Sequence, residues 1–321
     1  QALDRVWRLA QALPTELPRD LPRVRDVRAA LLAFVDRHPH VDSTDLGDLR
    51  AEWPTEYAIR FAIAELSWQL EEDDACVAQY EELLRRYPAA DDREHSAYTA
   101  LLCRYRQRER ERERPGRAMR DAPGPRALTE PESRLVAAAD RYVCMSPGAP
   151  DAMDAAYRAA RVHYEANRYE EAARRFGAIA EAAPAHEIAE FAANLYLDSL
   201  NLLSLDRPEC ATEMGAAVAR LGPLYCRTRA DRNAHPDLCS TLSALRCDLA
   251  RREAEAFSNL GLHDRARDRY LEIARVTLPC GRIDEALYNA AVEADHAHDA
   301  AGAARIRGTL RRTYPRSPLA R

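Results

Sequence analysis

Small, aromatic and proline residues recur along this chain in a fixed order: a small residue, an aromatic residue four positions later, and a proline eight positions after that. One copy has an extra residue before the proline, and the last two copies have glycine or arginine in the aromatic position: Cys76, Tyr80 and Pro88; Ala138, Tyr142 and Pro150; Ala172, Phe176 and Pro184; Ala266, Tyr270 and Pro279; Ala211, Gly215 and Pro223; Ala303, Arg307 and Pro315. A period of about 34 residues in a helical sequence is typical of stacked helical hairpins. The small residue lets two helices approach, the ring fills the gap to the next hairpin, and the proline ends the second helix because it lacks an N–H. The pattern predicts an all-α solenoid of antiparallel helix pairs.

The positions of these copies divide the chain into three parts. Residues 1–56 are expected to form an N-terminal helical hairpin from helices at 2–13 and 23–37, either as a cap or as the continuation of upstream repeats. Residues 57–225 are expected to hold helix pairs with an insert at about 113–130. Residues 226–321 are expected to begin with a linker, in which Asp231 to Pro236 form a loop, and to continue with a long helix at about 238–260 and a final pair.

An alternating tract of arginine and glutamate, here called the Arg/Glu tract, runs from Arg106 to Arg114 at the start of the insert. Its charges are balanced, so we interpret it as a solvated helix end with ion pairs at i,i+3, such as Glu109 with Arg112 and Glu111 with Arg114. The alternative is an RNA-binding tail, which the balance of signs disfavours.

The composition excludes several classes of protein. All 47 basic residues are arginine, so neither a P-loop lysine nor a lysine Schiff base can exist. The net charge of −5 disfavours nucleic-acid binding. No stretch of about 18 apolar residues is present, so no segment is expected to span a membrane. Because the chain begins with Gln1 and has no initiator methionine, we expect it to be a processed piece of a longer protein.

The presence of eight cysteines favours disulfide formation. The sequence has no C-x-x-C motif, so it gives no support for a zinc ribbon or a redox site. Two of them, Cys239 and Cys247, lie in one predicted helix about 12 Å apart along its axis, so they cannot bond to each other. The alternative is that cysteine replaces alanine as a small apolar residue in helix packing. The expected fold-back of the helices pairs the candidates as follows: Cys76 with Cys103, Cys226 with Cys239, and Cys210 with Cys247.

The pattern over roughly residues 57–317 resembles the tetratricopeptide repeat family. The matching residues are the turns and second helices from Asn167 to Ala172 and from Gly261 to Ala266, together with the closing prolines. The segments from Ala286 to Ala291 and from Tyr314 to Pro318 look like repeats of periplasmic envelope-assembly proteins, among them the outer-membrane-protein assembly lipoprotein, the cell-division coordinator of the Tol–Pal system and gliding-motility proteins. The resemblance implies a right-handed superhelical solenoid that binds proteins.

Enzymatic motifs are missing from the sequence. The segment starting at His186 has Glu190 where a zinc protease has its second histidine, and no G-x-S-x-G elbow is present. His296 and His298, with Asp295 and Asp299 beside them, have the side chains to coordinate a metal but fall in a predicted turn, where solvated polar residues are the usual case. We therefore expect no enzyme, no cofactor and no metal site.

The first helices of a repeat array line its inner groove. Aromatic and arginine side chains anchor many interfaces, although the same rings can instead pack between helices. We predict the following partner-binding residues: Phe61, Glu65, Trp68, Tyr157, Arg161, Tyr164, Arg251, Glu255 and Tyr288.

The predicted function is a non-enzymatic protein-binding scaffold in a bacterial cell-envelope assembly, located in the periplasm or at the outer membrane. The alternative is a regulatory repeat region of a cytoplasmic signalling or enzyme protein whose active domain is absent. Disulfides would favour the first hypothesis, because they persist in oxidising compartments.

Overall fold

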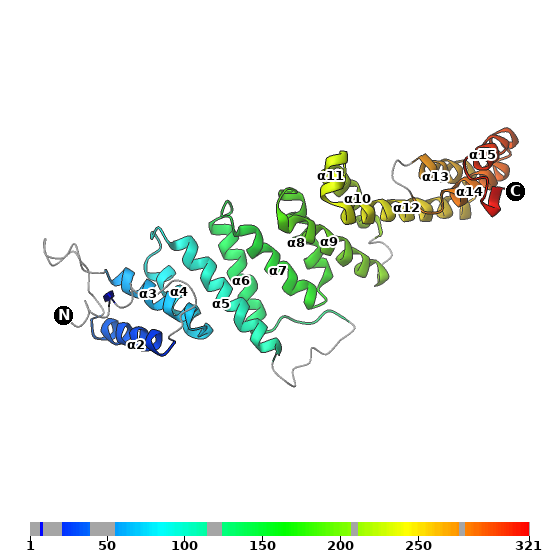
Figure 1. Cartoon of the computed structure of the whole chain (residues 1–321). Coiled ribbons are helices and arrows are strands. Elements are labelled where there is room, and N and C mark those ends of the chain that lie inside the picture. The colour runs from blue at the N-terminus through cyan, green and yellow to red at the C-terminus, as the bar shows by residue number, and fades with distance from the viewer. Residues whose placement is uncertain are drawn as a thin grey trace. The chain divides into compact units, whose positions relative to one another are not determined.

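A computed structural model describes residues 7–8, 21–38, 55–113, 124–206, 211–275 and 280–320, and every regular element in these ranges is a helix (Figure 1). The prediction of an all-α fold is therefore confirmed. The predicted helix at 2–13 lies outside the described residues except for Trp7 and Arg8. The helices are α2 Leu21–Arg37, α3 Glu56–Gln69, α4 Asp73–Arg86, α5 Arg93–Glu113, α6 Glu130–Met145, α7 Ala152–Glu165, α8 Tyr169–Ala182, α9 Glu187–Asp206, α10 Ala211–Tyr225, α11 Arg229–Ala234, α12 Pro236–Asn259, α13 His263–Arg275, α14 Ile283–His296, α15 Ala300–Thr313 and the short 3₁₀ helix η4 Pro318–Ala320.

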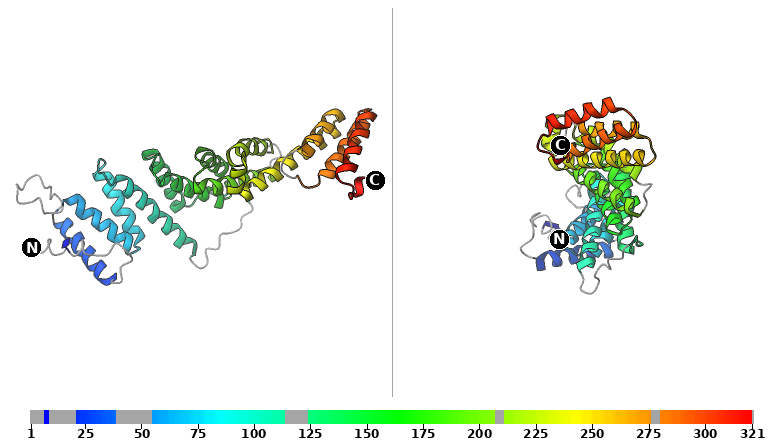
Figure 2. Two further views of the ribbon diagram at one scale, coloured as in Figure 1. Left: turned by 45° about the horizontal axis from the view of Figure 1, so that its top comes forward. Right: turned by 90° about the vertical axis from the view of Figure 1, so that its right-hand side faces the viewer.

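The chain divides into two compact units, Gln1–Ala172 and Ala173–Arg321, and the division falls within α8. In the first unit each helix from α2 to α7 packs against the next helix in sequence (Figure 2). In the second unit the packing runs from α9 to α10, and from α10 through α12, α13 and α14 to α15. The predicted boundary between residues 225 and 226 lies inside the second unit.

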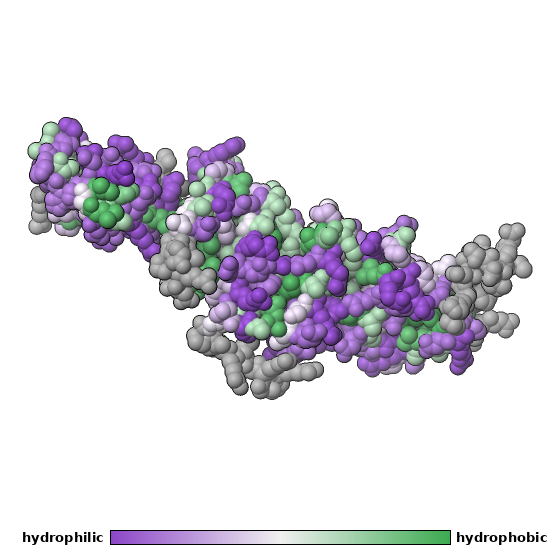
Figure 3. All heavy atoms as spheres, turned by 180° about the vertical axis from the view of Figure 1, so that it is seen from behind, coloured by the Kyte–Doolittle hydropathy of each residue, from purple (hydrophilic) through white to green (hydrophobic). Residues whose placement is uncertain are grey.

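Buried residues form separate clusters, each shared by two or three neighbouring helices. One cluster joins α2 to α3, a second joins α3, α4 and α5, a third joins α5, α6 and α7, and a fourth joins α12, α13 and α14. Apolar residues also reach the surface in patches among hydrophilic ones (Figure 3). Burial between neighbouring helices is what a repeat array requires, since one hairpin alone cannot cover its apolar face.

Four first helices end in the same way, which marks equivalent turns of the repeat. The second residue after each helix has a positive φ angle, and it is Glu71, Asn167, Gly261 or His298. In each turn the N–H of the following residue bonds to a carbonyl five positions earlier, as in the Asp299 to Ala294 bond of 2.8 Å. This is the hydrogen-bond pattern of a Schellman end, which reverses the chain into the second helix.

In the copies that begin at Cys76 and Ala172, the small residue and the ring occupy the packing positions that the pattern predicts. The small residues Cys76 and Ala172 and the rings of Tyr80 and Phe176 are fully buried. One proline behaves differently, because Pro223 lies inside α10 instead of ending it. The missing N–H at a proline removes one hydrogen bond, and here the helix ends only two residues later.

One further local prediction is wrong. The stretch from Asp231 to Pro236 was expected to be a loop, but its first part belongs to the short helix α11. Thr228 and Asp231 form a capping box there, with the Thr228 N–H donating to the Asp231 carboxylate at 2.8 Å and the Asp231 N–H donating to the Thr228 hydroxyl at 3.1 Å. Reciprocal bonds of this kind start a helix in a short polar segment.

Among the described residues three disulfides connect neighbouring elements, and two of them were predicted. Cys76 bonds to Cys103 between α4 and α5, and Cys226 bonds to Cys239 across the segment that contains α11. Their Cα–Cα distances are 6.3 and 5.6 Å. Both pairings follow from chain reversal at a short connection.

The predicted pairing of Cys210 with Cys247 is wrong. Cys247 bonds to Cys280, with a Cα–Cα distance of 5.7 Å, and Cys210 lies outside the described residues. The reason is the length of α13: this helix of 13 residues runs back along the last part of α12 and returns the chain to the level of Cys247 just before α14.

Candidate functional site

The predicted binding residues of the first helix pair lie on α3, where they contact other parts of the first unit. The Phe61 ring is half-buried, with its centroid 6.4 Å from that of Tyr80. The guanidinium carbon of Arg106 lies 4.2 Å from the centroid of the half-buried Trp68 ring, an arrangement in which the cation is attracted to the ring face. Each ring thus combines packing with a partly exposed surface.

Glu65, the third of these residues, is held by two hydrogen bonds. It accepts one from the Tyr80 hydroxyl and one from His95 Nε2, the latter at 2.8 Å. Burial raises the pKa of Glu65, but the hydrogen bonds from His95 and Tyr80 outweigh it, so the pKa is lowered. The hydrogen bond to Glu65 in turn raises the pKa of His95.

We expect His95→Gln to destabilise the protein at a pH of about 5.5 and to have little effect at about 8.5. A histidine with a raised pKa stabilises the fold below its unfolded-state pKa, and this contribution is lost as the pH rises through the folded-state value. Glu65, with a lowered pKa, stabilises the fold fully above its own unfolded-state pKa. The pair therefore stabilises the fold most between the unfolded-state pKa of Glu65 and that of His95. Because the His95 side chain is 54% exposed, the effect should be about 0.5 kcal/mol or less. Urea unfolding at both pH values measures it, and an equal difference at the two would contradict this reading.

The predicted residues of the third helix pair lie on α7, also in the first unit. Tyr157 and Tyr164 are half-buried, and the Tyr164 ring meets that of Tyr169 edge-to-face at 5.6 Å. Arg161 is exposed, and its Nη2 lies 2.9 Å from Glu165 Oε1. Side chains of α5 form hydrogen bonds to both α3 and α7, so the three first helices of this unit are connected.

The remaining predicted residues lie in the second unit. On α12, Arg251 Nη1 contacts Asp248 at 3.1 Å and Arg251 Nη2 donates to the Gly281 carbonyl at 3.4 Å. Glu255 on α12 and Tyr288 on α14 are exposed. The structure places all nine predicted residues on first helices, and their role in binding stays a prediction.

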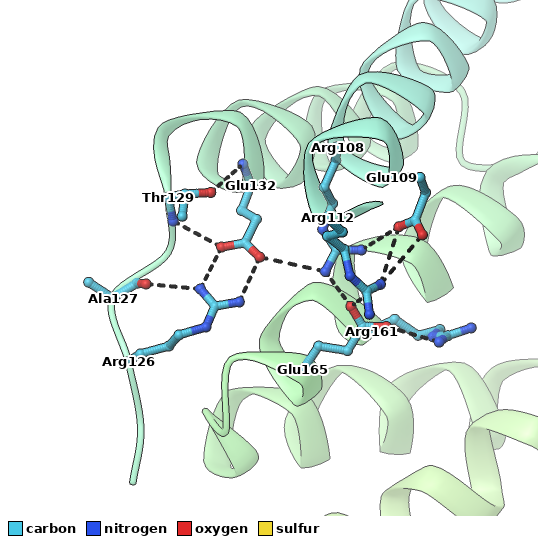
Figure 4. Close-up of polar contacts among 9 residues, drawn as sticks. All are labelled: Arg108, Glu109, Arg112, Arg126, Ala127, Thr129, Glu132, Arg161 and Glu165. Carbon is cyan, nitrogen blue, oxygen red and sulfur yellow. Dashed lines mark hydrogen bonds and ion pairs between the residues drawn. The ribbon is translucent and has the colours of Figure 1, made fainter. Parts of the chain in front are cut away.

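A network of ion pairs joins α5, α6 and α7 next to the insert (Figure 4). At its centre is Arg108, which is only 3% exposed. Its guanidinium contacts Glu109 at 2.8 Å, Glu132 at 3.5 Å, and also Glu165. A buried charge is tolerated only with such partners, so these contacts fix the start of α6 and the end of α7 against α5.

Glu132 connects this network to the chain that follows the insert. Two nitrogens of Arg126 bind its carboxylate at 2.7 Å each, and the Thr129 N–H donates to it at 2.9 Å within the capping box of α6 (Figure 4). Burial raises the pKa of Glu132, but the bonds from Arg126 and Thr129 and the charges of Arg126 and Arg108 outweigh it and lower the pKa to about 2. The network therefore holds the chain on both sides of residues 114–123.

This network corrects the expectation for the Arg/Glu tract. The pair of Glu109 with Arg112 is present at 3.4 Å, and the pair that involves Arg114 lies outside the described residues. Arg108, however, is buried, and Arg106 forms an ion pair with α4. With 21 residues, α5 is long enough for Arg106 and Arg108 to pack against neighbouring helices. Arg110, Arg112 and Glu113 are exposed, so the expectation of a solvated helix end is wrong only for the first part of the tract.

A groove of about 890 Å³ lies in the second unit. Its walls come from α10 and α13, and α12, which packs against both, also lines it. We call it the α10–α13 groove. A smaller hollow of about 600 Å³ lies in the equivalent place of the first unit, between α4 and α6 with α5 between them. Such hollows therefore recur between second helices. The residues lining the α10–α13 groove include Gly215, Val218, Leu242, Ser243, Arg246 and Ile273.

Gly215 lies in the wall of the α10–α13 groove, at a position where it departs from the recurring pattern. In the recurring pattern this position holds an aromatic residue, and the equivalent rings of Tyr80, Tyr142 and Tyr270 are buried. Apart from the residues next to it and the backbone of its own helix, no heavy atom lies within 4 Å of the point that a Cβ would occupy at Gly215. The missing ring leaves free space at this point of the wall, in addition to the kind of hollow that also occurs between α4 and α6.

The charge of this groove is opposite to that of the whole chain. Its charged lining residues are Arg227, Arg232, Arg246, Arg269 and Glu272. Within the described ranges neither Arg227 nor Arg246 forms an ion pair, and the buried Ser243 hydroxyl has no hydrogen-bond partner. Since the chain carries a net charge of −5, these groups favour an acidic ligand at this place.

None of the helices in the described ranges is long and apolar enough to cross a membrane. No family model matches this chain, and no curated protein matches it.

Proposed function

We propose that this protein is a non-enzymatic scaffold that binds a protein partner in a bacterial cell-envelope assembly, and that its helix pairs form a right-handed superhelical solenoid of the tetratricopeptide type. The observation that carries the proposal is the α10–α13 groove: an apolar cleft with an arginine-rich rim and an unsatisfied hydroxyl. An acidic segment of the partner fits this chemistry. Its apolar side chains would cover Ala219, Pro223 and Leu249, and its carboxylates would meet Arg227 and Arg246.

The three disulfides support an oxidising compartment. Two of them line the α10–α13 groove and connect α12 to the segments on either side of it. The periplasm is such a compartment, and we place the protein there. The alternative, a cytoplasmic regulatory region, predicts free thiols.

We expect Gly215→Phe to abolish partner binding without unfolding the protein. Gly215 lines the groove and has free space at its Cβ position, so the new ring is expected to occupy part of the groove. Replacing a glycine inside a helix should also add about 0.5 kcal/mol of stability, so unfolding would not explain a loss of binding. Arg246→Glu should weaken binding by about tenfold or more, whereas Arg252→Glu, on the opposite face of α12, is the matched control. Circular dichroism and binding isotherms measure both properties.

The partner is identified by placing a photo-crosslinking residue at Leu249, in the groove, or at Tyr164, on the predicted first-helix face, in protein expressed in the periplasm. Capture through Leu249 that is lost with Gly215→Phe supports the groove. Capture through Tyr164 alone, weakened by a folded Trp68→Ala variant, moves the site to α3 and α7. Capture through neither position contradicts the scaffold proposal.

A further inference from the structure

Two histidines and a glutamate meet where α13 begins and α14 ends, and nothing in the proposed scaffold uses them. They are His263, Glu293 and His296, whose potential ligand atoms all lie within 4.8 Å of one another. His263 Nδ1 is 2.8 Å from Glu293 Oε2, and the two imidazole rings meet edge-to-face with centroids 5.0 Å apart. Glu293 and His296 are three residues apart on α14, so they share one helix face.

The carboxylate of this cluster is buried and oriented. Glu293 is 6% exposed, and its second oxygen accepts a hydrogen bond of 2.7 Å from the Ser258 hydroxyl. Although the chain has 47 arginines, none forms an ion pair with Glu293 among the described residues. Arg307, which follows on α15, is bound instead to Asp295. The buried carboxylate thus has two imidazoles beside it and no arginine paired with it among the described residues.

The sequence had suggested a different set of ligands around His298. That residue is exposed in the left-handed turn after α14. Asp295 is paired with Arg307, and Asp299 caps α15 by accepting a hydrogen bond of 2.8 Å from the Gly302 N–H. Only the i,i+3 spacing of Glu293 and His296 was visible in the sequence, because the third residue lies 30 positions earlier and is brought there by the fold.

We propose that His263, Glu293 and His296 bind a divalent transition-metal ion, with Zn²⁺ as the best match, and that the ion fastens the start of α13 to the end of α14. Two imidazole nitrogens and one carboxylate oxygen form a donor set that zinc commonly takes, with water in the fourth position, whereas Mg²⁺ and Ca²⁺ prefer oxygen ligands. The ion would lie between His263 Nδ1 and Glu293 Oε2, which are 2.8 Å apart, and replace the hydrogen bond between them. The exposed His296 leaves the remaining position open to solvent. The Ser258 hydroxyl orients the carboxylate from behind.

The test is titration of the full chain with Zn²⁺ by calorimetry, and with Co²⁺ by visible absorption. Free thiols such as that of the exposed Cys144 are first alkylated so that they cannot bind the metal. We expect one ion per chain and a Zn²⁺-dependent rise in the unfolding temperature. His296→Gln, at an exposed position, should lower the affinity by more than about 100-fold, since even residues behind the ligands contribute about 10- to 100-fold.

His298→Asn is the matched control, because asparagine tolerates a positive φ angle and the residue lies outside the cluster. It should leave the affinity unchanged, and Ser258→Ala should reduce it by about 10- to 100-fold. Absence of binding by the native chain, or equal binding by His296→Gln, would overturn the proposal and leave the cluster as a hydrogen-bonded contact between α13 and α14.

Discussion

Arg108→Ala is expected to lower the free energy of unfolding by about 3–5 kcal/mol, the largest effect of any single substitution considered for this protein. The substitution removes the buried cation that lies between the carboxylates of Glu132 and Glu165. Each carboxylate would retain arginine partners, Arg126 for Glu132 and Arg112 for Glu165, but these partners are more exposed. Chemical denaturation of the two proteins measures the difference.

The matched control is Arg134→Ala, because Arg134 forms an exposed i,i+4 pair with Glu130 and should contribute only about 0.3–0.5 kcal/mol. The difference between native protein and Arg108→Ala should also depend on pH. Glu132 has a pKa lowered to about 2, so its contribution is complete above its unfolded-state value and is lost as the pH falls through about 2. If Arg108→Ala changed stability no more than Arg134→Ala, the network would not hold the insert.

Removing the Cys247–Cys280 disulfide by a double substitution to serine is expected to destabilise the protein by about 3.7 kcal/mol. The bond closes a loop with a sequence separation of 33 residues, and loop-closure entropy gives this value. The same argument gives about 2.9 kcal/mol for Cys226–Cys239, whose separation is 13 residues. The order of the two effects is therefore part of the prediction, and denaturation of both double variants measures it.

Cys144→Ser is the control for this experiment, since Cys144 is free and exposed. Its stability should stay within about 0.5 kcal/mol of the native value. Peptide mapping by mass spectrometry without reductant should find the three pairs Cys76–Cys103, Cys226–Cys239 and Cys247–Cys280. Free thiols at these six positions in protein isolated from its native source would remove the argument for an oxidising compartment.

The loss of the Cys247–Cys280 disulfide should also affect the α10–α13 groove. Both cysteines line it, and the bond holds α12 against the segment that follows α13. A destabilised but folded double variant is therefore expected to bind the partner less tightly, because the groove is no longer held open in one arrangement. Cys76–Cys103 lies in the other unit and serves as the comparison.

Local pattern was enough to predict the fold class and most of the helices, with α11 as an exception. The fully buried Tyr80 and Phe176 lie where the recurring pattern puts its rings, and Cys76 and Cys226 bond to the partners expected from chain reversal at short connections. These features depend on helical periodicity and on contacts between elements adjacent in sequence, which a sequence expresses directly.

Contacts that depend on the exact length of a helix, and so on where its end lies, could not be predicted from the local pattern. Cys247 finds Cys280 because α13 returns by a particular number of residues, and Arg108 is buried because α5 extends far enough to meet α6 and α7. The Arg/Glu tract has the composition of a solvated helix, and nothing in that composition distinguishes a buried arginine from an exposed one.

The order of residues alone therefore determined that this protein is all-helical, built of repeated pairs, free of lysine chemistry and able to form disulfides between adjacent helices. Only the folded arrangement decided that Gly215 lines a cationic groove, that Arg108 lies among three carboxylates, and that His263 lies beside Glu293 and His296. The physical reason is that periodicity specifies which face of a helix is buried. The lengths of the helices and the points at which the chain reverses specify which side chains, far apart in sequence, meet on that face.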